Sequence, residues 1–194
     1  MALEYERKFH TDTDTLKKID AALTEAPYIL HMETTYYDTP DRSLFQRKIT
    51  LRRRWENGVS VCTMKLPANG YGREEIQLEA DSITDAIPGL CKESGFCNLL
   101  SLFSHGVLPV CGAKFTRKAR KIQFNGSVLE VSLDAGHLLG GSRALPFCEV
   151  EVELLSGETR DADLYAVLLQ KRFGLVEETL SKYRRALNLA KGEL

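Results

Sequence analysis

Charged and apolar residues alternate with a period of two through much of the chain. In the stretch LEYERKF, residues 3–9, most apolar residues fall on one side of an extended strand, while Glu4, Glu6 and Lys8 fall on the other. The reason is that strand side chains point alternately to opposite faces. A single Glu-x-Glu-x-Lys pattern also fits an edge strand with its polar face in water. The later strands must therefore decide whether such a face is solvated or enclosed.

The same alternation predicts a series of further strands, joined mainly as hairpins. Asn57–Gly58 and Asn125–Gly126 mark two tight turns, since Asn-Gly is a strong signal for a two-residue hairpin loop. The predicted strands span residues 33–39, 47–56, 59–66, 71–80, 114–124, 127–134 and 146–155. About eight strands, most of them in hairpins, favour a closed antiparallel barrel or a strongly curved sheet.

Helical spacing of apolar residues appears in a few connecting segments. Residues 11–26 place Leu16, Ile19, Ala22 and Leu23 on one stripe behind possible Thr and Asp caps. Residues 83–104 are predicted to be helical but irregular, broken by Pro88, Gly89 and Gly95.

Two more helices are expected near the end of the chain. The first spans residues 161–174, with Leu164, Val167 and Leu168 on one side and Gly174 as its stop signal. The second spans residues 181–192. The predicted fold class is therefore α+β, mainly β, in one domain over residues 1–194.

Composition and charge narrow the class of protein. Of 194 residues, 43% are hydrophobic and 27% charged, and the net charge of -1 gives no global attraction to nucleic acid or anionic membranes. We expect a cytoplasmic protein without a membrane or nucleic-acid partner, because no leader-like or membrane-length apolar run is found. The five scattered cysteines suit neither a disulfide framework nor a zinc knuckle. The sequence leaves the oligomeric state open.

The charged strand faces are sorted by sign. Acids concentrate in the first and last strands, and Arg or Lys in the middle strands. If these faces point into a barrel, clustered carboxylates require a hard cation such as Mg²⁺ or Mn²⁺, and clustered guanidinium groups require a polyanion. Together they indicate a site for a polyphosphate chain.

Eight ordered segments carry a family resemblance. The chain resembles the CYTH-domain proteins, the triphosphate tunnel metalloenzymes, from about residue 2 to residue 190, and is similar to bacterial inorganic triphosphatases and animal thiamine triphosphatases. The resemblance implies a closed eight-stranded antiparallel β-barrel, a tunnel with a few flanking helices, that binds triphosphate and a divalent metal, Mg²⁺ or Mn²⁺. The segments are LEYERKF, TYYDTPD, LRRR, the Lys of TMKLP, the Arg of TRKARK, EVSLD, CEVEVELLSG and the Lys of SKYRR.

The resemblance also implies roles for individual residues. Catalytic roles fall to Glu4, Glu6 and Lys8, and Glu75 is a further tunnel acid. Whether Arg117 shares its role with Lys118 or Arg120 stays open, because basic residues occupy both faces of that strand. The implied metal ligands are Glu4, Glu6, Glu149, Glu151, Asp134 and Glu130. The implied substrate-binding residues are Lys8, Arg52, Arg54, Lys65, Arg73, Arg117 and Lys182.

The implied activity is metal-dependent hydrolysis of a triphosphate, with inorganic tripolyphosphate giving pyrophosphate and phosphate. Thiamine triphosphatase, class IV-type adenylate cyclase and a non-catalytic polyphosphate- or nucleotide-binding module remain alternatives. RNA binding through RRRW and RKARK is disfavoured by the overall charge. Thr50 stands where animal thiamine triphosphatases have a stacking Trp, and Trp55 is expected outside the tunnel, so inorganic triphosphate is the favoured substrate.

Overall fold

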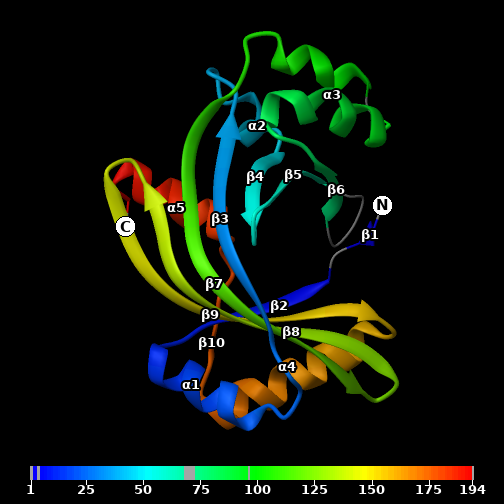
Figure 1. The fold of residues 1–194 in the computed structure, drawn as a ribbon, viewed down its shortest axis with the longest axis vertical. Helices are drawn as coiled ribbons and strands as arrows, with labels where there is room; N and C mark the ends of the chain where they lie inside the picture. Colours follow the sequence, from blue (N-terminus) through cyan, green and yellow to red (C-terminus); the bar gives the residue numbers. More distant parts are fainter. Residues whose placement is uncertain (1, 4, 68–72, 96, 194) are drawn as a thin grey trace.

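One antiparallel sheet of ten strands dominates the chain (Figure 1). The computed structural model describes residues 2–3, 5–67, 73–95 and 97–193. The strands are β1 (Ala2–Leu3), β2 (Glu6–His10), β3 (Tyr28–Asp38), β4 (Thr50–Glu56), β5 (Val59–Pro67), β6 (Arg73–Glu79), β7 (Leu108–Phe124), β8 (Ser127–Gly140), β9 (Arg143–Ser156) and β10 (Val176–Glu177). The helices are α1 (Thr13–Ala22), α2 (Ser43–Gln46), α3 (Ile83–Glu93), the 3₁₀ segment η1 (Cys97–Phe103), α4 (Thr159–Phe173) and α5 (Lys182–Lys191).

The strand order is β1-β6-β5-β4-β3-β7-β8-β9-β2-β10, with β1 and β10 at the edges. The mainly β, antiparallel character is confirmed. The sheet has ten strands instead of eight, and no hydrogen-bonded strand pair among the described residues joins its two edges, so a closed barrel is not confirmed. The two ends of the sheet are nevertheless close along the chain: the edge strand β1 pairs with β6, while β2, three residues further on, lies next to the other edge strand β10 and pairs with β9.

Both predicted Asn-Gly turns are confirmed. Asn57 and Gly58 have φ of 50° and 94°, and Asn125 and Gly126 have φ of 51° and 90°. Positive φ at both central positions gives a turn whose twist matches that of the flanking strands. The turns connect β4 to β5 and β7 to β8.

Two expectations about the helices were wrong. Pro88 lies inside α3 without ending it, and Gly89 serves close packing, because a Cβ there would lie 2.6 Å from Leu78 Cδ1 on β6. On α4, the expected stripe is not the packed one, since Leu164 and Leu168 are exposed. The helix instead buries Ala162, Ala166 and Leu169, because small side chains let it lie close to the sheet.

The two faces of the sheet differ in chemistry. On the outer face, α1 and α4 pack over β2, β8 and β9, and α3 packs over β4 to β6, both through apolar side chains. On the inner face, cross-strand register brings charged residues together, because directly paired residues share a face. Lys8 pairs with Glu151, and Arg117 with Asp134. The charged faces are therefore turned inward.

Helix α5 packs on the inner face. Tyr183, Ala186, Leu187 and Leu189 join a core cluster with inward residues of β3, β7, β8 and β9. Gly140 on β8 permits the contact, since a Cβ there would lie 2.5 Å from the Ala190 nitrogen and 2.7 Å from the Ala186 oxygen. Packing of α5 brings Lys182, its first residue, to the charged interior. None of the helices in the described ranges is long and apolar enough to span a membrane.

Candidate functional site

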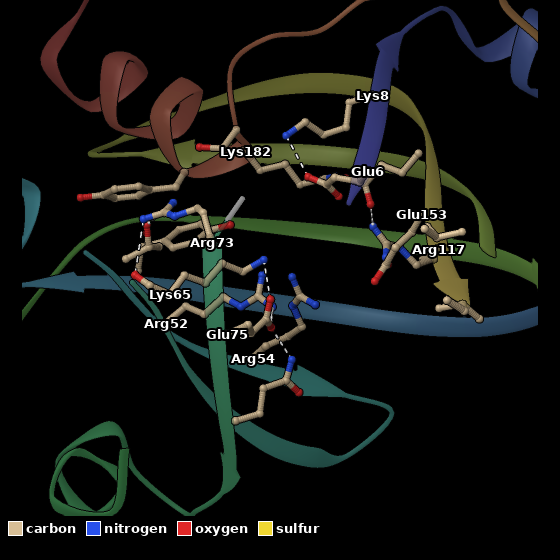
Figure 2. Close-up of a pocket in the computed structure, with 18 residues that line it drawn as sticks. Glu6, Lys8, Arg52, Arg54, Lys65, Arg73, Glu75, Arg117, Glu153 and Lys182 are labelled. Carbon is tan, nitrogen blue, oxygen red and sulfur yellow. Dashed lines mark hydrogen bonds and ion pairs between the residues drawn. The ribbon is translucent and has the colours of Figure 1, made fainter. Parts of the chain in front are cut away.

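The inner face of the sheet encloses a cavity of about 640 Å³ (Figure 2). All of the basic residues that the sequence assigned to substrate binding line it. Among the described residues, the four carboxylates of Glu6, Glu75, Glu151 and Glu153 also line it. The lining cations are Lys8, Arg52, Arg54, Lys65, Arg73, Arg117 and Lys182.

One wall of the cavity is strongly basic. Strands β4, β5 and β6 contribute Arg52, Arg54, Lys65 and Arg73, accompanied by the carboxylate of Glu75 (Figure 2). Glu75 contacts Lys65 Nζ at 2.6 Å and Arg52 Nη2 at 3.3 Å. Burial disfavours the charged carboxyl, but these two cations outweigh it and lower the pKa of Glu75 to about 2. One acid thus serves two of the four cations.

The guanidinium groups of this wall are held in place but incompletely matched by anions. Arg54 Nε donates to Thr34 Oγ1 at 3.1 Å, and Arg54 Nη1 contacts Glu56 at 3.3 Å. Burial, followed by repulsion from Arg52 and Arg117, lowers the pKa of Arg54 to about 10. Arg52 Nε is buried and makes no hydrogen bond within the described ranges. The wall therefore favours an added anion.

The opposite wall combines acids and bases (Figure 2). Strand β2 supplies Glu6 and Lys8, whose side chains meet at 3.0 Å, and β9 supplies Glu151 and Glu153. Burial opposes the charge on Lys8, but attraction to Glu6 and Glu151 raises its pKa. On this wall the three acids Glu6, Glu151 and Glu153 outnumber the base Lys8.

Three buried carboxylates from β8 and β9 lie close together. Oxygens of Asp134, Glu149 and Glu151 all lie within 4.8 Å of one another, and all three residues are buried. Lys182 Nζ lies among them, 2.9 Å from Asp134 Oδ2 and 2.7 Å from Glu151 Oε1, and it also contacts Glu149. Burial raises the pKa of Glu151, but Arg117 and Lys182 outweigh it and hold that pKa well below the usual range.

The donor set of this cluster fits a hard divalent cation. Mg²⁺ and Mn²⁺ prefer carboxylate oxygens, and three such groups from β8 and β9 offer oxygens at mutually compatible separations. Carboxylates this deeply buried also require positive charge close by. Glu6, on the neighbouring strand, lines the same cavity.

Other predicted residues lie elsewhere. Glu4 falls outside the described residues. Glu130 does not line the cavity, and its carboxylate accepts hydrogen bonds from Tyr28 and Ser132. On β7, Lys118 and Arg120 both contact Asp20 of α1 and do not line the cavity. Only Arg117 of the three faces inward.

Trp55 lies outside the cavity, as expected, and Arg53 lies beside it. Arg53 Nε donates to Ser60 Oγ at 2.8 Å, and its guanidinium lies 4.7 Å from the Trp55 ring centroid. Neither residue lines the cavity, and Trp55 is 41% exposed. Thr50 does line it.

Two charged residues of the site were missed. Glu153, which the sequence analysis gave no role, lines the cavity. Arg185 contacts Glu149 and Glu178. The sequence could have indicated Arg185, because it stands three residues after Lys182 and residues at this spacing lie on one face of a helix.

The family model of the CYTH domain matches residues 2–187. The inorganic triphosphatase of Haemophilus influenzae is 31% identical over 138 residues, which cover 68% of this chain and 38% of that protein. The matched region is therefore less than half of the length of this relative.

Solved structures share the fold. A protein from Hippeastrum, described as having a dominant triphosphatase activity, matches with a TM-score of 0.71 at 18% identity, covering 99% of this chain and 97% of that one. A protein from Pyrococcus horikoshii matches with a TM-score of 0.65 at 22% identity, covering 97% of this chain and 99% of the other.

Proposed function

The chain belongs to the CYTH domain family, and on that premise we propose that it hydrolyses inorganic tripolyphosphate to pyrophosphate and phosphate with the help of Mg²⁺ or Mn²⁺. The observation that carries the proposal is the cavity itself, where four cations on one wall face a carboxylate-rich wall. The similarity to the Haemophilus influenzae inorganic triphosphatase supports the same reaction.

The basic wall is the proposed cradle for the phosphates. Arg52 and Arg54 present guanidinium groups that can grip phosphate oxygens in bidentate fashion, and Lys65 and Arg73 add further donors from β5 and β6. Hydrolysis of a phosphoanhydride depends mostly on positioning and on neutralising negative charge. These side chains would orient the chain and stabilise the charge on the leaving phosphate.

The wall of the cavity that carries Glu6 and Glu151 is the proposed metal-binding side. Glu6, Glu149, Glu151 and Asp134 would hold the ion, with Glu4 proposed from the sequence alone. A bound divalent ion supplies Lewis-acid polarisation of a phosphoryl oxygen and lowers the pKa of water. Lys8, held by Glu6 at 3.0 Å, would bind a phosphate oxygen beside these acids.

Specificity for the inorganic substrate is proposed from the aromatic residues. Trp55 lies outside the cavity, and Thr50 offers no ring for stacking. Of the aromatic residues that the structure describes, Tyr36 and Tyr183 line the cavity; both are buried, and they pack against each other with ring centroids 5.0 Å apart. An organic triphosphate that meets no exposed ring among the described residues forgoes about 1 kcal/mol of stacking.

Phosphate release should be measured with tripolyphosphate, thiamine triphosphate and ATP, each with Mg²⁺ and with Mn²⁺ at the same pH. We expect the highest kcat/KM for tripolyphosphate and no turnover in excess chelator. A preference for thiamine triphosphate would contradict the argument from Thr50. Formation of cyclic AMP from ATP, without phosphate release from tripolyphosphate, would replace hydrolysis with cyclisation.

A further inference from the structure

The centre of the buried carboxylate cluster is held by a side chain of the protein itself. Lys182 Nζ contacts Asp134, Glu149 and Glu151, the three residues whose oxygens lie within 4.8 Å of one another. Its side chain is 8% exposed, and those of Asp134 and Glu149 are 0% exposed. The ammonium thus stands where these carboxylates would bind a metal ion.

The three carboxylates are compensated by three cations. Arg117 makes a bidentate contact with Asp134, both distances being 2.8 Å, and also contacts Glu151. Arg185 contacts Glu149. A buried carboxylate without a cation is strongly disfavoured, so a chain that must fold before it meets a metal benefits from a cation of its own.

Lys182 is the member of this set best suited to leave. Arg117 is fixed by a planar fork on Asp134 and by Glu151. Lys182, in contrast, carries a point charge on a flexible four-carbon stem, anchored at the first turn of α5 where Ser181 caps the helix. It already lines the cavity. Rotation about its own side-chain bonds is enough to move the ammonium from the carboxylates into the cavity.

We propose that Lys182 is a tethered counter-ion that a divalent cation displaces from Asp134, Glu149 and Glu151, and that the displaced ammonium then binds the triphosphate. The inference rests on the proposed function of this site. This displacement couples binding of the metal to binding of the triphosphate. Metal binding frees the Lys182 ammonium to donate hydrogen bonds to phosphate, and phosphate binding keeps that ammonium away from the carboxylates that bind the metal. Such coupling is reciprocal, so each ligand raises the affinity for the other.

The first test measures Mn²⁺ binding without any triphosphate, by loss of the free Mn²⁺ signal in electron paramagnetic resonance. We expect Lys182→Gln to bind Mn²⁺ at least ten-fold more tightly than the wild type, because the competitor is gone. Lys65→Gln is the matched control, since Lys65 lines the same cavity but contacts Glu75 instead of the cluster. Its Mn²⁺ affinity should stay within three-fold of the wild type. Unchanged or weaker binding by a folded Lys182→Gln variant would overturn the inference.

The second test uses the unaltered protein, in case the variant does not fold. Acetylation of Lys182 by acetic anhydride, followed by mass spectrometry of the peptides, should be at least three-fold faster in saturating Mg²⁺ than in chelator. A rate that Mg²⁺ leaves unchanged or reduces would refute displacement.

The inference and the proposed function fail separately. Tripolyphosphate hydrolysis together with unchanged Mn²⁺ binding in Lys182→Gln would overturn only the counter-ion role. Tighter Mn²⁺ binding in that variant, with no hydrolysis by the wild type, would overturn only the triphosphatase activity.

Discussion

Arg54 is expected to lower the stability of the folded protein and to strengthen triphosphate binding. It is 9% exposed, and burial followed by repulsion from Arg52 and Arg117 lowers its pKa to about 10. A depression of this size corresponds to about 3 kcal/mol of unfavourable free energy for the charged side chain in the folded state. Replacing Arg54 with Met, which has a similar length and no charge, removes that cost.

The net pKa shift already includes the attraction to Glu56 at 3.3 Å, so the replacement loses in addition only the hydrogen bond to Thr34 at 3.1 Å. That bond is worth about 1 kcal/mol. We therefore expect Arg54→Met to gain about 2 kcal/mol in the free energy of unfolding. For a chain of this size, that gain corresponds to a rise in Tm of about 4–8 °C.

Triphosphate binding should change in the opposite direction. A hydrogen bond to a charged phosphate contributes about 1.5–3 kcal/mol, so loss of Arg54 should weaken tripolyphosphate binding by about 10- to 100-fold. Calorimetric titration with tripolyphosphate would give the Kd, and thermal unfolding without ligand would give the Tm.

Arg53→Met is the matched control, because Arg53 lies on the outer face beside Trp55. Its Kd should stay within about two-fold of the wild-type value. Equal losses of affinity in Arg53→Met and Arg54→Met would show that the assignment of the two strand faces is wrong. A much lower Tm with unchanged affinity in Arg54→Met would show that Arg54 only supports the fold.

Three further substitutions test other parts of the site. The pKa of Glu75 is lowered to about 2, so the stabilisation from its charged carboxylate is present above an unfolded-state pKa of about 4.5 and is lost as the pH falls toward 2. Glu75→Gln should therefore lower the free energy of unfolding by about 2 kcal/mol at pH 7. At pH 3 the loss should be less than half as large, and urea unfolding at the two pH values would measure both. Glu6→Gln should reduce Mg²⁺-dependent phosphate release at least ten-fold with an unchanged circular dichroism spectrum, and near-normal turnover would remove Glu6 from the metal side. Gly140→Ala should lower Tm and weaken tripolyphosphate binding, because the added Cβ would lie 2.5 Å from the backbone of Ala190 and push α5 and Lys182 outward; an unchanged Tm would show that α5 can adjust.

Strand parity gave most of the cavity wall from the sequence alone. Arg52 and Arg54 line the cavity and Arg53 does not, because a strand exposes alternate residues to opposite faces, a purely local rule. The two Asn-Gly turns then fixed which strands lie next to each other. Local chemistry therefore predicted which side chains face inward on β4 and β5.

Contacts between distant segments could not be predicted in this way. The prediction of the buried face of α4 was wrong because the pattern gave more weight to three large apolar residues than to two alanines. The sheet instead packs against the smaller side chains. The partners of Lys182 depend on how α5 packs against β8, which no local period encodes. Glu130 shares the parity of Asp134 but comes earlier on β8, and it does not line the cavity.

The position of the first strands bears on the order of folding. Residues 2–10 supply both β1, which pairs with β6, and β2, which pairs with β9, so Phe9 lies opposite Val150. Pairings so distant along the chain raise the contact order and slow folding, since a large loop must close before they form. During synthesis, β1 and β2 are made before their partners β6 and β9, so they are among the last strands to be paired. Strand β2, which carries Glu6 and Lys8, can join the sheet only after β9 has been made. A nascent chain that ends before β9 therefore cannot form both walls of the cavity.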